Sequence, residues 1–158
     1  MPNLMSFHKP FLTLDDLPVS VGLNNWTIFP YIDPIMILGV PHISQSQSFY
    51  LQSYFSFHDS TINNEAHWTN FFHKGTYSLK ILHAKSETSG ILSIKMDDLV
   101  LGTPDWYSEG WSLFEKTIYS DLKLSKSNHT LKMKITDKNA SSVAYNMYVS
   151  CFTFRRTA

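Results

Sequence analysis

The sequence predicts an all-β sandwich that follows an extended arm. Its 158 residues suffice for one domain, and 43% are hydrophobic against 16% charged, so the chain can bury a core without disulfides. From residue 48 onward, apolar and polar residues alternate in short runs separated by turn-forming residues, as in half-buried strands. No stretch has the 3.6-residue period of an amphipathic helix. These observations predict a domain of antiparallel strands.

Prolines set residues 1–47 apart from the rest of the chain. Six of the seven prolines lie at or before Pro41, which excludes a long helix and removes N–H donors that a central strand needs. The segment is also too apolar for a free linker. We therefore predict an extended arm that packs on its own domain or clamps a neighbouring subunit. The arm residues expected to make assembly contacts are Phe11, Leu14, Trp26, Phe29, Tyr31 and Ile35.

Strands follow one another from residue 48. Residues 48–57, 75–83 and 91–96 each alternate, with Tyr77 and Leu79 on one side of the second run. The second and third runs are joined by the turn-forming sequence KSETSG, which predicts a hairpin.

The remaining runs extend this pattern to the C-terminus. Strand-like stretches are LVLG, LFEKTIY, HTLKMKITD and AYNMYVSCFTF, with turns at Asp97-Asp98 and at residues 125–128. Seven or eight short strands at this spacing predict an antiparallel jelly-roll β-sandwich over residues 48–158.

The pattern between residues 75 and 156 resembles two groups of jelly-roll modules. The shared motifs are a G-x-Y-x-L strand (75–79), a hairpin turn, an H-T-L-K strand (129–132) and a K-N-x-S-S loop (138–142). Such modules occur in phage and virus structural proteins and as sugar-binding modules attached to glycosidases. Their hairpin carries Asp-Gly, whereas this chain has Asp97-Asp98, and Asp tolerates a positive φ less readily than Gly.

The main functional prediction is a non-enzymatic viral or phage structural protein. It would be a capsid, spike or tail subunit that forms a trimer or ring through its arm, with other virion proteins and a host glycan as further partners. Thirteen basic and 13 acidic residues give zero net charge, so no overall field attracts nucleic acid. The expected location is the virion, after synthesis in the host cytoplasm.

The alternative prediction is a free-standing carbohydrate-binding module. A cytoplasmic or non-classically secreted protein accords with this alternative, because the first residues lack a basic region followed by an apolar stretch. The longest apolar run, Ile35 to Val40, is too short to cross a bilayer, so no membrane insertion is expected.

A loop rich in aromatic residues is the candidate sugar site. Trp106, Tyr107 and Trp111 lie within GTPDWYSEGW, and exposed rings there can stack on a sugar. Sugar-binding modules of this fold combine loop aromatics with an asparagine, a role for which the resemblance permits Asn139. The alternatives are that these aromatics cover the end of the sandwich or form a subunit contact, and that the loop around Asn139 only makes turn hydrogen bonds.

No catalytic site, metal site or cofactor is predicted. The sequence lacks a nucleophile elbow and a phosphate-binding glycine loop. Four histidines share one region without the spacing of a zinc site: His58, His67, His73 and His83. A structural calcium ion is the one open alternative, to which Asp97 or Asp98 could contribute an oxygen.

Overall fold

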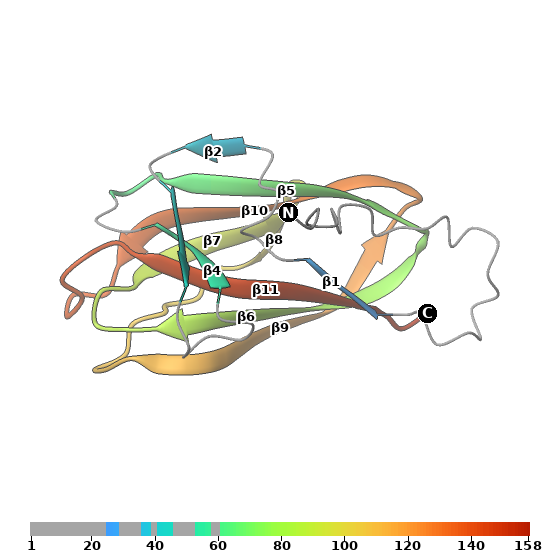
Figure 1. Ribbon diagram of the computed structural model, residues 1–158. Coiled ribbons are helices and arrows are strands. Elements are labelled where there is room, and N and C mark those ends of the chain that lie inside the picture. The colour runs from blue at the N-terminus through green and yellow to red at the C-terminus, as the bar shows by residue number, and fades with distance from the viewer. Residues whose placement is uncertain (1–24, 29–35, 39–40, 46–52, 58–60) are drawn as a thin grey trace, which may run out of the picture.

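In the computed structural model the chain forms two antiparallel sheets that pack face to face (Figure 1). The structure describes residues 25–28, 36–38, 41–45, 53–57 and 61–158, and the side chains of 55–57, 61–112 and 117–158. The first sheet has the order β3-β4-β11-β6-β9, with β1 also paired to β11, and the second has the order β2-β5-β10-β7-β8. The described residues contain no helix, hence none long and apolar enough to cross a membrane. The prediction of an all-β sandwich is therefore confirmed.

The strands differ widely in length. Their bounds are β1 Asn25–Ile28, β2 Met36–Leu38, β3 Pro41–Gln45, β4 Ser53–Phe57, β5 Glu65–Phe72, β6 Gly75–Lys85, β7 Gly90–Met96, β8 Leu99–Gly102, β9 Ser112–Leu124, β10 Ser127–Lys138 and β11 Met147–Arg156.

The core lies between the sheets and combines aliphatic side chains with several aromatic rings. Alternate residues of β7 and β10 are buried, as the period-2 pattern predicts. Trp68 of β5 lies with its ring centroid 5.4 Å from that of Phe55 and 4.8 Å from that of Phe152, so it joins the two sheets. Both contacts are edge-to-face, a geometry worth about 0.5–1.5 kcal/mol beyond burial of the rings.

The predicted hairpin between residues 75–83 and 91–96 is wrong. β6 pairs with β9 and β11 in the first sheet, whereas β7 pairs with β8 and β10 in the second. The turn residues between β6 and β7 therefore carry the chain from one sheet to the other. Alternation shows which face of a strand is buried but not which strand is its neighbour, and turn residues serve both kinds of connection.

Three segments from the predicted arm pair with the sheets of this same chain. β1 pairs with β11, β2 with β5, and β3 with β4. Trp26 lies opposite Phe154 in the β1–β11 register, but its side chain is outside the described part. The other arm residues named above also lie outside the described residues: Phe11, Leu14, Phe29, Tyr31 and Ile35. The division into arm and sandwich at residues 47 and 48 stays a prediction.

The two ends of the sandwich carry different connections. We call the loops 86–89, 103–111 and 139–146 the loop end, at the left of Figure 1. We call the short connections 73–74, 97–98 and 125–126 the turn end.

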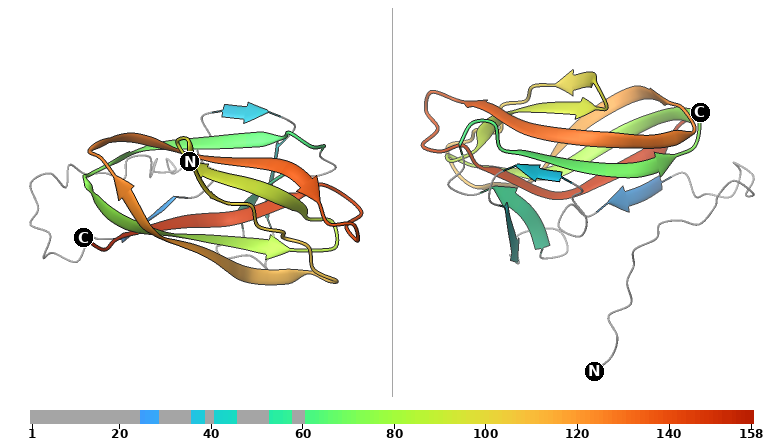
Figure 2. Two further views of the ribbon diagram at one scale, coloured as in Figure 1. Left: turned by 180° about the vertical axis from the view of Figure 1, so that it is seen from behind. Right: turned by 90° about the horizontal axis from the view of Figure 1, so that it is seen from above.

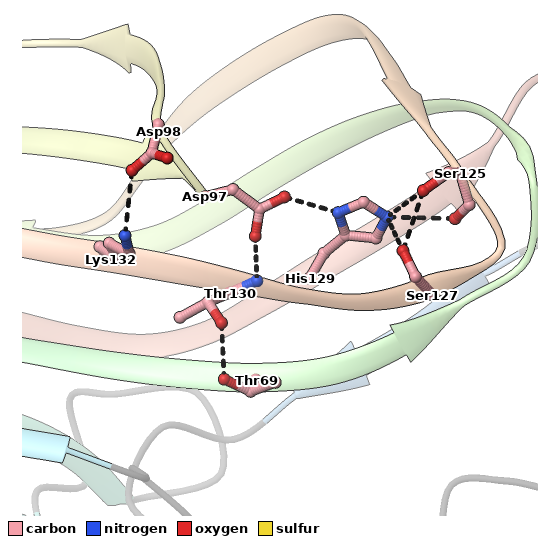
Figure 3. A network of polar contacts seen from close by, with 8 residues as sticks. All are labelled: Thr69, Asp97, Asp98, Ser125, Ser127, His129, Thr130 and Lys132. Carbon is pink, nitrogen blue, oxygen red and sulfur yellow. Dashed lines mark hydrogen bonds and ion pairs between the residues drawn. The ribbon is translucent and has the colours of Figure 1, made fainter.

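At the turn end, the β7–β8 hairpin forms although Asp98 stands where the Asp-Gly pattern has glycine, and the positive φ falls on Asp97. Asp97 has a φ of 53°, a left-handed conformation that costs most residues ~1–2 kcal/mol. Its carboxylate accepts hydrogen bonds from His129 Nδ1 at 2.6 Å and from the backbone N–H of Thr130 at 2.8 Å (Figure 3). Its own N–H donates to the Thr130 carbonyl oxygen at 2.7 Å. These three bonds to β10 offset the backbone cost.

Candidate functional site

The three loops of the loop end are joined by main-chain hydrogen bonds. The central loop, 86–89, bonds to both of its neighbours. The bonds are Ser86 N to Trp106 O (3.3 Å), Ser108 N to Ser86 O (3.2 Å), Val143 N to Glu87 O (3.0 Å) and Asn146 N to Thr88 O (2.9 Å). Because the backbone itself holds the loops together, their side chains are presented from a fixed frame.

Trp106 anchors the 103–111 loop rather than facing solvent. Its side chain is 1% exposed, and its indole stacks on the imidazole of His83 at 3.8 Å with 4° between the planes. His83 Nε2 lies 2.9 Å from the Thr117 hydroxyl, which fixes the imidazole in turn. Within the described part of the chain, Trp106 Nε1 is buried without a hydrogen-bond partner. A sugar in solution cannot reach this ring, which corrects the expectation for Trp106.

Trp111 is the exposed aromatic residue of the same loop. Its side chain is 46% exposed and packs edge-on against the ring of Tyr148 at 4.8 Å. Tyr148 is buried, accepts a hydrogen bond from Asn146 Nδ2 at 2.8 Å, and lies 3.1 Å from the Thr88 hydroxyl. Trp111 thus presents a half-exposed indole that rests on the ring of Tyr148, which is itself held by hydrogen bonds with Asn146 and Thr88.

Asp105 and Asn139 form a polar pair that links two loops. Asn139 Nδ2 donates to Asp105 Oδ2 at 2.7 Å, and the backbone N–H of Tyr107 donates to Asp105 Oδ1 at 2.9 Å. Asn139 Oδ1 accepts from the backbone N–H of Ser141 at 3.0 Å. The structure therefore brings Asn139 to the aromatic loop, while Tyr107 is only partly exposed.

Lys138 and Ser142 hold the 139–146 loop in shape. Lys138 Nζ donates to the Ser142 carbonyl oxygen at 2.9 Å and lies 5.1 Å from the centre of the Tyr145 ring. The buried Ser142 hydroxyl donates to the Ser89 carbonyl oxygen, 2.9 Å away. These contacts hold the loop in its turn conformation, as expected if its polar residues shape the loop rather than bind a ligand.

Two supporting residues were missed by the sequence analysis. Tyr148 and His83 each lie in a strand-like run, where alternation marks them only as inward or outward residues. Tyr148 packs against Trp111, and His83 stacks on Trp106. Both contacts are made with a loop that is distant from these residues in the sequence. Nothing in the local pattern of either strand signals such a contact.

Within the described ranges, no three potential metal ligands come together. His67 contacts the neighbouring Glu65 carboxylate, His83 is covered by Trp106, and His58 lies outside the described residues. Asp97 is committed to His129 and Thr130, and Asp98 accepts a hydrogen bond from Lys132 Nζ at 3.4 Å (Figure 3). The absence of a cofactor stays a prediction.

The pKa of the Asp97 carboxyl group is lowered from its ordinary value. Burial alone would raise it, but the hydrogen bonds from His129 and from the Thr130 backbone lower it, as do the nearby charges of His129 and Lys132. Asp97 therefore stabilises the turn end as a carboxylate.

Comparisons with known proteins find similarity in structure but not in sequence. No family model and no curated protein sequence matches the chain. A Paenibacillus xanthan lyase superposes with a TM-score of 0.68 at 18% identity, covering 77% of this chain and 12% of the lyase. The CBM36-1 domain of a multidomain xylanase from the hindgut metagenome of Trinervitermes trinervoides gives 0.62 at 12% identity, covering 85% of this chain and 99% of the domain. A family 6 carbohydrate-binding module from Clostridium cellulolyticum in complex with xylose gives 0.60 at 14% identity, covering 83% and 97%.

These similarities establish the fold and correct the main functional prediction. The prediction of a viral or phage structural subunit is wrong, because the similar structures include several carbohydrate-binding modules that match this chain over almost their whole length. The alternative, a carbohydrate-binding module, is the better supported of the two predictions.

Proposed function

We propose that this chain is a non-enzymatic carbohydrate-binding module that holds a sugar at its loop end. The observation that carries the proposal is the half-exposed indole of Trp111, which lies on the buried ring of Tyr148. The fold shared with carbohydrate-binding modules supports it, since one of them was solved with xylose.

Trp111 is suited to stack on the apolar face of a sugar ring. Aromatic rings offer a large apolar surface, and Tyr148 already fixes one edge of this indole. A side chain that is ordered before binding loses less conformational entropy when the ligand arrives. The fixed position of Trp111 therefore favours binding.

Asp105 and Asn139 are suited to bind sugar hydroxyl groups. A carboxylate can accept about four hydrogen bonds, and an amide nitrogen can donate two. The bonds described above use two acceptor positions of Asp105 and one donor position of Asn139. Both groups thus retain hydrogen-bonding capacity while their orientation is fixed by each other.

The first ligands to test are β-linked plant cell-wall polysaccharides, because the similar modules include a xylanase domain and a xylose complex. We expect xylan or a related neutral glycan to bind in calorimetry or affinity electrophoresis. Trp111→Ala should reduce binding by at least about tenfold, because it removes the stacking surface.

Ile118→Ala is the matched control, since Ile118 is another exposed apolar residue and lies on β9, away from the loop end. It should bind like the unmodified protein. Unchanged binding by Trp111→Ala, or no binding of any neutral glycan by the unmodified protein, would contradict the proposal.

A further inference from the structure

The outer face of the second sheet carries basic side chains on adjacent strands. β5, β10 and β7 run side by side with β10 in the middle (Figure 2). Buried and partly exposed residues alternate along β10 and β7, so Lys132, Lys134 and Lys95 point away from the core. We call the surface formed by His67, Lys95, Lys132 and Lys134 the basic face.

The strand register places three of these residues in one row. Lys132 lies opposite His67 of β5 on one side and opposite Lys95 of β7 on the other. Directly opposed side chains in a sheet have Cβ atoms about 4.5–5.5 Å apart, and like charges at this distance destabilise the sheet. The Lys95–Lys132 pair thus costs stability in the free protein.

Neighbouring acidic groups compensate this charge only in part. Lys132 Nζ donates to Asp98 at 3.4 Å, but the Asp98 side chain is fully exposed, so solvent screens the pair. Glu65 lies opposite Lys134 in the register, yet its carboxylate contacts His67. Among the described residues, the amino groups of Lys95 and Lys134 make no hydrogen bond or ion pair.

Hydroxyl groups and one aromatic ring continue the basic face along β5 and β10. The Thr69 and Thr130 hydroxyl groups are 2.7 Å apart in the next row. Phe71, in the row beyond, is 51% exposed and lies edge-on to the ring of His73 at 5.5 Å. Cationic, hydroxyl and aromatic groups therefore follow one another along this sheet face.

We infer that the basic face binds an anionic polysaccharide, whose acidic groups lie between Lys95 and Lys132 with Lys134 beside them. A bound carboxylate or sulfate group would attract both lysines and so offset the repulsion between them. Relief of this repulsion would favour binding. This site lies on the sheet and is separate from the loop end.

A polysaccharide fits this face better than a nucleic acid does. The chain has zero net charge, whereas nucleic-acid binding depends on many simultaneous phosphate contacts. Single strands also need successive aromatic platforms for their bases, and Phe71 is the one exposed ring described on this face. A polysaccharide with spaced acidic groups matches a few lysines and adjacent hydroxyl groups.

The test is affinity electrophoresis of the whole chain in gels that contain polygalacturonate, dextran sulfate or neutral dextran. Polygalacturonate tests carboxylate groups and dextran sulfate tests sulfate groups. We expect at least one of them to retard the protein, neutral dextran to have no effect, and added NaCl to weaken the retardation.

Lys95→Glu separates this site from a simple effect of charge. It should reduce binding about tenfold or more, yet leave the Tm unchanged or higher, because the introduced carboxylate would attract Lys132. Lys123→Glu is the matched control: it makes the same change in net charge at an exposed position of β9, in the other sheet, and should retain binding.

Four results would overturn the inference. They are no retardation by either polyanion, equal losses in Lys95→Glu and Lys123→Glu, equally tight binding of single-stranded DNA, and loss of polyanion binding in Trp111→Ala but not in Lys95→Glu. The last result would place the acidic sugar at the loop end. Neutral-glycan binding by Lys95→Glu and Trp111→Ala reports separately on the proposed function.

Discussion

The loop end and the turn end of the sandwich are stabilised in different ways. At the loop end, main-chain bonds join the three loops and the Asp105–Asn139 pair adds one side-chain link, and Trp111, Asp105 and Asn139 keep exposed surface. At the turn end, side chains make the connections: His129 lies between Asp97 and Ser127 and bonds to both (Figure 3). A polar side chain that holds a turn has less capacity for a ligand. The difference indicates why binding is expected at the loop end.

The largest expected effect concerns the anchor of the loop end. Trp106→Ala removes a fully buried indole and its stack on His83, so it should lower the free energy of unfolding by ~3–5 kcal/mol. Urea denaturation measures this loss. Trp106→Phe is the control, because it keeps an aromatic ring and removes the buried, unpartnered Nε1, and should cost clearly less. Equal losses in the two variants would show that the stacked ring is not the anchor.

At the turn end, Asp97→Ala should cost ~1–2 kcal/mol, because His129 and the Thr130 N–H lose their acceptor. Because Asp97 lies at the turn end and the proposed sugar site lies at the loop end, xylan binding by the folded variant should not change. The neighbouring Asp98→Ala, which removes only an exposed contact, should be close to neutral in the same denaturation measurement. A loss of sugar binding in folded Asp97→Ala would contradict the inference that the turn end contributes to stability but not to binding.

Acid should weaken the turn end through the same carboxylate. The pKa of Asp97 is lowered in the folded chain, so its contribution is complete above the ordinary value of 3.8 and is lost as the pH falls through the lower, folded value. Urea unfolding from pH 6 to acid should therefore show a steeper loss of stability in the unmodified protein than in Asp97→Asn. Parallel curves would mean that Asp97 does not contribute this dependence.

The sequence predicted the strands better than it predicted their partners. The alternation in residues 91–96 and 129–137 placed β7 and β10, because one buried face imposes a two-residue period. The alternation could not assign β6 and β7 to different sheets, because the strands that pair with them include β9, β10 and β11, which lie far along the sequence. Trp106 and Trp111 differ for a similar reason. Both lie in one turn-rich loop, and only contacts with β6 and β11 make the first an anchor and the second an exposed surface.

Trp111→Ala should lower stability less than Trp106→Ala or Asp97→Ala, although it is the variant with the largest expected effect on sugar binding. Because nearly half of the indole is already exposed, its removal should cost about 1 kcal/mol or less, through the contact with Tyr148. Thermal unfolding compares this variant with Trp106→Ala. The contrast between a stabilising and a binding tryptophan, five residues apart, holds only if Trp111→Ala unfolds at a much higher temperature than Trp106→Ala while binding less sugar. Similar losses of stability in both variants would mean that Trp111 also anchors its loop, and that reduced binding by Trp111→Ala reflects a displaced loop rather than a lost stacking surface.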